Sequence, residues 1–271
     1  MAVEAAIALR LVGRHWETPN LDGAGWVDTP YALDPRETGF VALHLWNVGD
    51  AGGPAVPDGF LVDMGTRESQ EESVRIAERY IRPAIAASRA VGLPIFHVEP
   101  ANIAMQYVSV HHMLDEDASS SRPVRPRPPE VNPGWQKERA ERTHGPGYLA
   151  WDGWSQMRIL SSCDAEPGDQ VILTGRQFDR ICRSRGLKNL VYTGFATNMC
   201  ILDAAAATRE MLGYGYRIFL IREATLAVEF PETFADRLVT RVALKYFQLT
   251  IGDTLGFEQY MAACQAVTAA R

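Results

Sequence analysis

Short apolar runs alternate with segments of helical spacing along most of this 271-residue chain. Such runs, bounded by turn-forming residues, are typical of strands buried on both faces of a sheet. They are GFVALHLWN (39–47), LPIFHV (93–98), GDQVIL (168–173), LKNLVYTGF (187–195) and YRIFLIRE (216–223). The helical segments are 69–92, 177–186, 200–215, 231–247 and LGFEQYMAACQAVTAA near the C-terminus. Because parallel strands need long crossover connections, this alternation predicts an α/β fold of three layers, α/β/α, around a mostly parallel central sheet.

Two stretches depart from the alternation, although nothing in it forces a boundary within a single domain of residues 1–271. Residues 1–38 are rich in Gly, Pro and Asp, and we expect them to form an irregular N-terminal arm. The stretch at about 101–150 contains SSSRPVRPRPPEVNPG, whose composition is typical of an extended excursion rather than a packed element. We expect this excursion to serve as a lid or as an arm between subunits.

Composition and charge narrow the classes of partner. The formal net charge of -6 argues against a nucleic-acid or anionic-membrane surface, which would need a basic footprint. The N-terminal residues lack the pattern of a signal peptide, and no run of about 18 apolar residues predicts a membrane span. The four cysteines are widely spread and form no CxxC pair or zinc spacing, so we expect no metal and no cofactor. A reducing cytoplasm is the simplest setting for such a chain.

The segment LVYTGFATNMCILDAAAATREMLGYG is the most informative about chemistry. A buried strand is expected to end at Gly194, and a helix to begin with Cys200 in its first turn, after the good N-cap types Thr197 and Asn198. In open α/β sheets, sites form outside the carboxyl ends of the strands. The unpaired N–H groups at a helix N-terminus favour a thiolate and can hold an oxyanion. The alternative is that Cys200 is a small buried apolar residue.

The same segment resembles the signature of the isochorismatase-like cysteine hydrolases, which include nicotinamidases and N-carbamoylsarcosine amidases. In that family a strand ends in Gly-x-Ala/Thr-Thr-Asp/Asn-x-Cys and is followed by an Ala-rich helix, Gly-Tyr and another strand. The matching residues are Gly194, Ala196, Thr197, Asn198, Cys200, Ala205, Gly213 and Tyr214. The resemblance extends over roughly residues 34–255, and it is weak over 101–165.

The resemblance implies that Cys200 is a nucleophile that attacks a carbonyl carbon, expels ammonia or an amine, and leaves an acyl-enzyme for water to cleave. It also implies an oxyanion hole made by the backbone N–H groups of Ala196 and Cys200, with a cis peptide bond between Phe195 and Ala196. We expect seven residues to line the pocket of a small-molecule substrate: Trp46, Asn47, Glu99, Arg176, Phe195, Thr197 and Asn198. The aromatic residues could instead be core, and Glu99 could instead make a structural hydrogen bond.

The chain departs from the family pattern at two catalytic positions. Aligned without a gap from Asp34, the first strand places His44 where the family has its catalytic Asp. A Cys–His pair is a common activated nucleophile, so His44 is the candidate base; alternatively it is packed within a degenerate site. The family Lys has no counterpart, because no Lys occurs between Lys137 and Lys188. Arg176 is the nearest cation, and it is either an electrostatic substitute or a solvated loop residue.

Three functions remain open at this level. The first is a hydrolase of a small amide, imide or ureide C–N bond that works through a thioester on Cys200. The second is a catalytically degenerate member that binds a small ligand or serves as a non-catalytic subunit. The third is a vinyl-ether hydrolase, which depends on the absent Asp. Some family members bind a metal, but His97, Glu99, His111 and His112 do not have the required spacing. Family members usually form homo-oligomers, dimers or tetramers, and the same is expected here.

Overall fold

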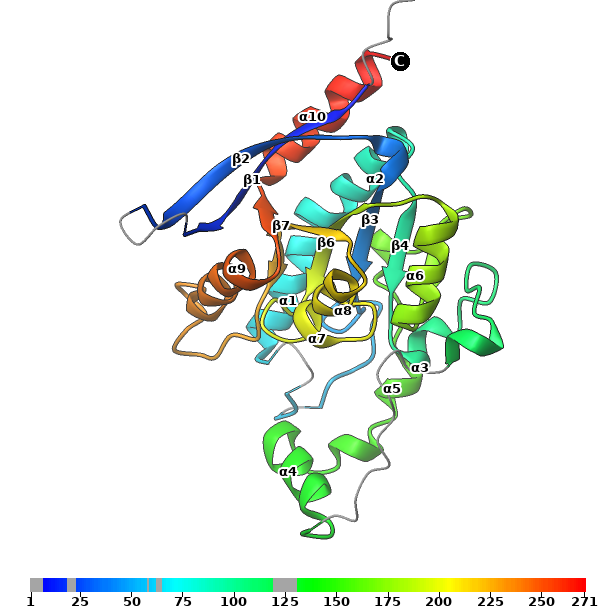
Figure 1. Cartoon of the computed structure of the whole chain (residues 1–271). Coiled ribbons are helices and arrows are strands. Elements are labelled where there is room, and N and C mark those ends of the chain that lie inside the picture. The colour runs from blue at the N-terminus through cyan, green and yellow to red at the C-terminus, as the bar shows by residue number, and fades with distance from the viewer. Residues whose placement is uncertain (1–6, 19–22, 58, 62–64, 119–130) are drawn as a thin grey trace, which may run out of the picture.

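The computed structural model describes residues 7–18, 23–57, 59–61, 65–118 and 131–271. Its centre is an eight-stranded sheet in the order β2-β1-β8-β7-β6-β3-β4-β5 (Figure 1). Six strands are parallel to one another: β3 (Thr38–Leu43), β4 (Ile95–Val98), β5 (Gln170–Ile172), β6 (Asn189–Phe195), β7 (Arg217–Leu226) and β8 (Asp253–Leu255). The prediction of a mostly parallel α/β sheet is confirmed.

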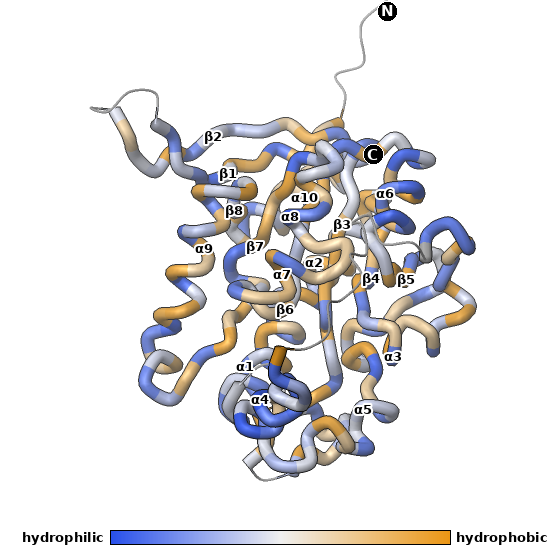
Figure 2. The backbone as a smooth tube through the Cα atoms, turned by 60° about the horizontal axis from the view of Figure 1, so that its bottom comes forward, coloured by the Kyte–Doolittle hydropathy of each residue, from blue (hydrophilic) through white to orange (hydrophobic). Residues whose placement is uncertain are grey.

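Helices cover both faces of the sheet and complete three layers. One face carries α1 (Arg67–Ile76), the π-helical turn η2 (Ala77–Ile81), α2 (Arg82–Ala90) and α10 (Phe257–Ala269). The other carries α6 (Gly175–Ser184), α7 (Cys200–Asp203), α8 (Thr208–Gly213) and α9 (Leu238–Thr250). In Figure 2 the hydrophobic stretches concentrate in the central strands, and hydrophilic ones lie outward, as on α6. No helix in the described ranges has the length and apolar character needed to cross a lipid bilayer.

The N-terminal arm is not irregular, and that expectation is wrong. Strands β1 (Leu9–Glu17) and β2 (Gly25–Leu33) form an antiparallel hairpin, and β1 joins the sheet beside β8 through the pair Arg14 and Thr254. Partly buried and exposed residues alternate along β2, so it has no continuous apolar run. Pro30 is compatible with its position because β2 is the edge strand of the sheet.

Two predicted helices are shorter than expected. The segment 200–215 is not one helix, because it is interrupted between α7 and α8 where Ala206 has a φ of 59°. The break is stabilised by side chains, since the Tyr192 hydroxyl donates to the Ala206 carbonyl at 2.8 Å and the Thr208 hydroxyl to the Ile201 carbonyl at 2.6 Å. Helix α9 begins at Leu238 rather than near Pro231.

The excursion is partly structured. Its short helices are α3 (Ala101–Ala104), η3 (Asp115–Ala118), α4 (Trp135–His144) and η4 (Tyr148–Ala150), and α5 (Gly153–Gln156) and η5 (Ser161–Cys163) follow it before β5. The Pro-rich residues 119–130 lie outside the described residues. Edge-to-face rings of Phe60, Tyr148, Trp151 and Trp154 attach the second half of the excursion to the loop that follows β3.

Candidate active site

Three neighbouring strands bring the predicted site residues to one edge of the sheet. Leu43, the last residue of β3, pairs with Gly194 of β6 on one side and with Val98 of β4 on the other. His44 therefore follows β3 between the ends of β6 and β4, with Glu99 next to it after β4. Gly194 is required here, because its φ is 112° and a Cβ atom would stand 1.9 Å from the Leu43 carbonyl oxygen.

A tight turn carries the chain from β6 to Cys200, the first residue of α7. The peptide bond between Phe195 and Ala196 is cis, as predicted. The Ala196 carbonyl accepts hydrogen bonds from the N–H groups of Met199 and Ile201, at 3.0 and 3.1 Å. Cys200 is half-buried, whereas the other three cysteines are buried. Because α7 has only four residues, its dipole is weaker than that of the helix expected over 200–215.

Thr197 and Asn198 stabilise this turn, but they do not cap α7 as expected. The residue at the N-cap position is Met199, which makes no side-chain capping bond. The Thr197 hydroxyl is 2.7 Å from the Thr225 hydroxyl, and the Asn198 side-chain oxygen accepts from the Val228 N–H at 3.0 Å. Both bonds attach the turn to β7 and the segment that follows it, so these residues fix where Cys200 lies.

His44 occupies an unusual environment. Its φ of 53° turns the chain sharply after β3, and its ring stacks on Trp46 with 5.0 Å between centroids. The residue is only partly buried, yet Nδ1 is buried and has no hydrogen-bond partner among the described residues. Because the ring is desolvated, the pKa of His44 falls to about 3, and the imidazole is neutral at physiological pH.

Glu99 is a buried carboxyl group at the same edge, with a relative exposure of 1%. Its Oε1 accepts from the Leu45 N–H at 3.2 Å, and its Oε2 accepts from the Trp46 indole N–H at 3.0 Å. Burial raises the pKa of Glu99 to about 8, although these two hydrogen bonds oppose the rise. A carboxyl group at this edge of the sheet is therefore largely protonated at neutral pH.

Residues 158–160, which follow the excursion, pair with residues 45–47 after His44. Trp46 forms an isolated antiparallel bridge with Ile159, and the Leu160 N–H donates to the Leu45 carbonyl at 2.7 Å. The Asn47 side-chain oxygen accepts from the Arg158 N–H at 2.9 Å. Asn47 thus has a structural partner, and its side chain holds the excursion against the site.

The two residues that directly follow β5 are not cationic. Leu173 and Thr174 follow β5, and the Thr174 hydroxyl caps α6 by accepting from the Gln177 N–H at 3.1 Å. Arg176 lies exposed in the first turn of α6. Sequence reasoning overlooked Arg158, whose guanidinium donates to the Ser155 and Met157 carbonyls beside Asn47. The position of Arg158 depends on where the chain runs after the excursion, and no local sequence motif predicts it.

The histidines considered for a metal are engaged elsewhere. His97 Nε2 is 3.2 Å from an oxygen of Asp169, a carboxylate that also pairs with Arg89 at 2.5 Å. His111 Nδ1 is 3.0 Å from the Val171 carbonyl oxygen. Across the described ranges, His, Cys, Asp and Glu side chains form no group of three or more that could hold a metal ion.

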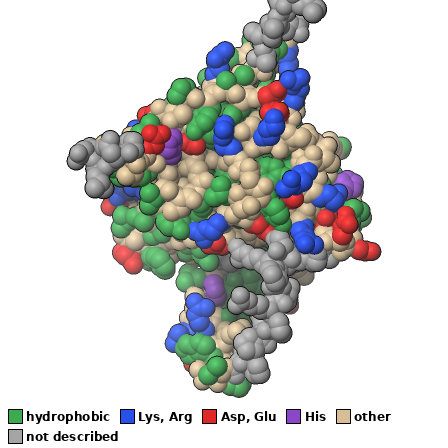
Figure 3. All heavy atoms as spheres, viewed as in Figure 1, with side chains coloured by type: hydrophobic (Ala, Val, Ile, Leu, Met, Phe, Trp, Pro, Cys, Tyr) green, Lys and Arg blue, Asp and Glu red, His purple; other side chains and the backbone are tan. Residues whose placement is uncertain are grey.

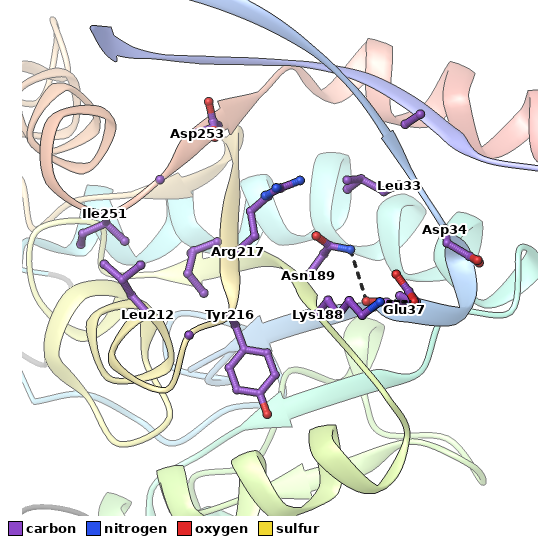
Figure 4. Close-up of a pocket in the computed structure, with 14 residues that line it drawn as sticks. Leu33, Asp34, Glu37, Lys188, Asn189, Leu212, Tyr216, Arg217, Ile251 and Asp253 are labelled. Atoms are coloured by element: carbon purple, nitrogen blue, oxygen red, sulfur yellow. Dashed lines mark hydrogen bonds and ion pairs between the residues drawn. The ribbon is translucent and has the colours of Figure 1, made fainter. Parts of the chain in front are cut away.

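The surface is hollowed at the edge of the sheet that carries Cys200, and a second hollow lies at the opposite edge. In Figure 3 the surface is hollowed between the main body and the lobe with α4, on the side toward which β3 and β4 run in Figure 1. A separate cavity of about 650 Å³ lies at the opposite edge, by the amino ends of β6 and β7 (Figure 4). Two of its charged side chains, Lys188 and Glu37, form an ion pair at 2.5 Å.

Comparisons with known proteins give relatives of modest similarity, and no protein-family model matches the sequence. A ureidoacrylate amidohydrolase RutB of Pseudomonas savastanoi pv. phaseolicola is 27% identical over 188 residues, which cover 64% of this chain and 64% of that protein. The RutB of Agrobacterium fabrum is 24% identical over 209 residues, covering 72% of this chain and 78% of that protein. The chain thus spans less than two thirds of the length of the first relative.

Among solved structures, a cysteine hydrolase from Pseudomonas syringae pv. phaseolicola superposes with a TM-score of 0.54 at 13% identity. The superposition covers 87% of this chain and 95% of that one. At this identity the match demonstrates a shared fold and leaves the chemistry to be argued from the residues.

Proposed function

We propose that this chain, which has the isochorismatase-like α/β fold, is a cysteine-dependent hydrolase of a small amide, imide or ureide C–N bond. The observation that carries the proposal is the position of Cys200: half-buried, at the start of α7, beside the strand ends that present His44 and Glu99. The similarity to amidohydrolases supports the same class of reaction.

In the proposed reaction the Cys200 thiolate attacks the carbonyl carbon of the substrate, and the backbone N–H groups of Ala196 and Cys200 stabilise the oxyanion that forms. The C–N bond then breaks, the nitrogen leaves with a proton as ammonia or an amine, and a thioester remains on Cys200. Water cleaves the thioester, which releases the acid and restores the thiol. Trp46, Phe195 and Arg176 are proposed to line the pocket.

The base is the difficult step. An ordinary thiol has a pKa of about 8.5, so a proton transfer from it to a base of pKa about 3 costs ~7 kcal/mol. His44 with no neighbouring charge is therefore a poor acceptor. A nearby negative charge would raise its pKa and lower this cost.

Alkylation with iodoacetamide tests the nucleophile. Because burial raises the pKa of Cys163, Cys182 and Cys264, we expect Cys200 to react at least tenfold faster than any of them at pH 8. Peptide mass spectrometry after short exposure identifies the labelled site. Equal labelling of all four cysteines, or an inert Cys200, would contradict the proposal.

A screen of small amides and ureides, with release of ammonia or amine as the readout, tests the reaction. Turnover that Cys200→Ser abolishes supports a hydrolase. The second candidate, a ligand-binding or non-catalytic family member, is favoured by the absence of the family Asp and Lys. It is supported if a substrate-like amide binds without turnover.

The setting of the protein is also a proposal. We propose a cytoplasmic homo-oligomer of two or four chains with the excursion at its interface, and light scattering after gel filtration measures the number of chains.

A further inference from the structure

We propose that Glu99 is the positioning residue of this site: its carboxyl group fixes the His44 imidazole through Trp46 and the Leu45 N–H, and its ionisation enables that imidazole to take the thiol proton. The inference rests on the proposed function, because it assigns a proton path to the same site. Glu99 directly follows β4, the strand next to β3, whose end is where the resemblance places an acid.

Glu99 holds the two residues that directly follow His44. One carboxyl oxygen holds the N–H of Leu45, the residue directly after His44, and the other holds the indole of Trp46. That indole stacks on the imidazole at an interplanar angle of 25°. The backbone on the other side is held as well, since the His44 N–H donates to the Val98 carbonyl at 3.0 Å. The orientation of the imidazole therefore depends on the carboxyl group of Glu99.

Among the described residues, no cation contributes to the pKa of Glu99. Two titratable groups lie near it: His44 after β3, whose ring stacks on the indole that Glu99 holds, and Tyr107 after α3, whose hydroxyl accepts from the Ile159 N–H at 3.1 Å. Burial raises the pKa of Tyr107 strongly, and the charges of Asp164 and Glu99 raise it further, so Tyr107 stays neutral. With no cation among these groups to neutralise it, a negative charge on Glu99 favours the protonated form of the neighbouring His44.

The proton balance is simple. As pH rises through about 8, Glu99 loses its proton to solvent and becomes a carboxylate. The Cys200 S–H bond then breaks, the proton forms a bond to a nitrogen of His44, and the electron pair stays on sulfur. The imidazolium is stabilised by the Glu99 carboxylate, as in other Cys–His–carboxylate sites. Buried charge-assisted hydrogen bonds to Leu45 and Trp46 stabilise the carboxylate at the same time.

The rate of Cys200 alkylation by iodoacetamide between pH 6 and pH 10 tests the inference without a known substrate. In the wild type, we expect a rise with a midpoint near pH 8. In Glu99→Gln the amide cannot ionise, so we expect the rise to move to higher pH and the rate at pH 8 to fall roughly tenfold. Glu258→Gln removes an exposed carboxylate from α10 and is the matched control, with an unchanged profile.

Two further variants test the path through His44. Trp46→Phe keeps a ring for stacking but loses the indole N–H, and we expect a smaller shift in the same direction. In a His44→Gln background, Glu99→Gln should have no further effect, since the two residues act as one unit. Where Glu99→Gln does not fold, the Trp46→Phe profile decides.

The results separate this inference from the proposed function. A Glu99→Gln profile that coincides with the wild type overturns the inference even if amides are hydrolysed. Faster alkylation in Glu99→Gln than in the wild type also overturns it, since this would mean that the carboxylate only repels the thiolate and slows alkylation. A Trp46→Phe profile unchanged from the wild type overturns it too. A shifted Glu99→Gln profile without any amide turnover supports the inference and contradicts the hydrolase.

Discussion

His44 links the site to the stability of the fold at the scale of a single residue. Its folded-state pKa of about 3 lies below the ordinary 6.5, so folding favours the neutral ring. This contribution is complete above pH 6.5 and is lost as pH falls toward 3, because the unfolded chain then binds a proton that the folded one does not. Within that window the loss is about 1.4 kcal/mol per pH unit.

His44→Gln tests this linkage, because glutamine has no charge to gain. We expect the free energy of unfolding of the wild type to fall more steeply than that of the variant between pH 6 and pH 4. Urea denaturation followed by circular dichroism at half-unit intervals measures both slopes. Parallel slopes would mean that His44 is solvated in the folded protein.

Single residues also show how far sequence reasoning could reach. The position of Cys200 after β6 followed from a local motif, the cis bond before Ala196 followed from the family resemblance that this motif carries, and both are found. The hydrogen bonds of Glu99 depend on the position of residues 44–46, which the chain after the excursion holds in place through Ile159 and Leu160. No window around Glu99 contains that information. The catalytic roles of Cys200 and His44 stay predictions.

At the scale of elements, helix α9 shows why its start was misplaced. Its N-terminus is capped by Glu229, which lies nine residues before Leu238 and is fully buried. The carboxylate accepts from the Thr240 N–H at 2.8 Å and from the Val239 N–H at 3.3 Å. Local capping rules search the residue beside the helix, where Arg237 makes no side-chain cap. The helix was predicted to begin at Pro231 instead, because proline is common in the first turn of helices.

Removal of this distant cap should weaken the protein measurably. We expect Glu229→Ala to lower the free energy of unfolding by about 1–3 kcal/mol, because buried N–H groups of α9 lose their acceptor. Glu232→Ala, which removes an exposed carboxylate three residues after Glu229, is the matched control and should change the free energy of unfolding by less than about 0.5 kcal/mol. Chemical denaturation at pH 7 compares them. Equal effects of both substitutions would show that α9 does not depend on Glu229.

At the scale of the whole molecule, the parallel strands were predictable because each is an apolar run bounded by turn residues. The hairpin of β1 and β2 and the short strand β8 were not. Residues in the hairpin alternate between buried or partly buried and exposed for most of its length, and β8 has three residues, so neither contains a long apolar run. Their pairing is also non-local, since Arg14 meets Thr254. Such contacts come from the assembled sheet and not from any one segment.

The hairpin covers an edge that would otherwise be exposed. Strand β1 pairs with β8, and its buried residues Leu9 and Leu11 join the core beside α10. Asp253 at the start of β8 fastens both hairpin strands, because it is 2.5 Å from His15 Nδ1 and accepts from the Tyr31 hydroxyl at 3.1 Å. An uncovered sheet edge is a template for pairing with another chain.

A chain that begins at Asp34 should therefore aggregate. It loses the apolar contacts of Leu9 and Leu11 and exposes the ladder groups of β8, so we expect soluble aggregates in gel filtration and a lower melting temperature. A chain that begins at Ile7 keeps the whole hairpin and is the control. Asp253→Asn keeps the hairpin but weakens its fastening, and we expect an intermediate loss of about 1–2 kcal/mol. If the chain from Asp34 instead remains unaggregated and melts like the control, the hairpin contributes neither to stability nor to protection of the sheet edge at β8.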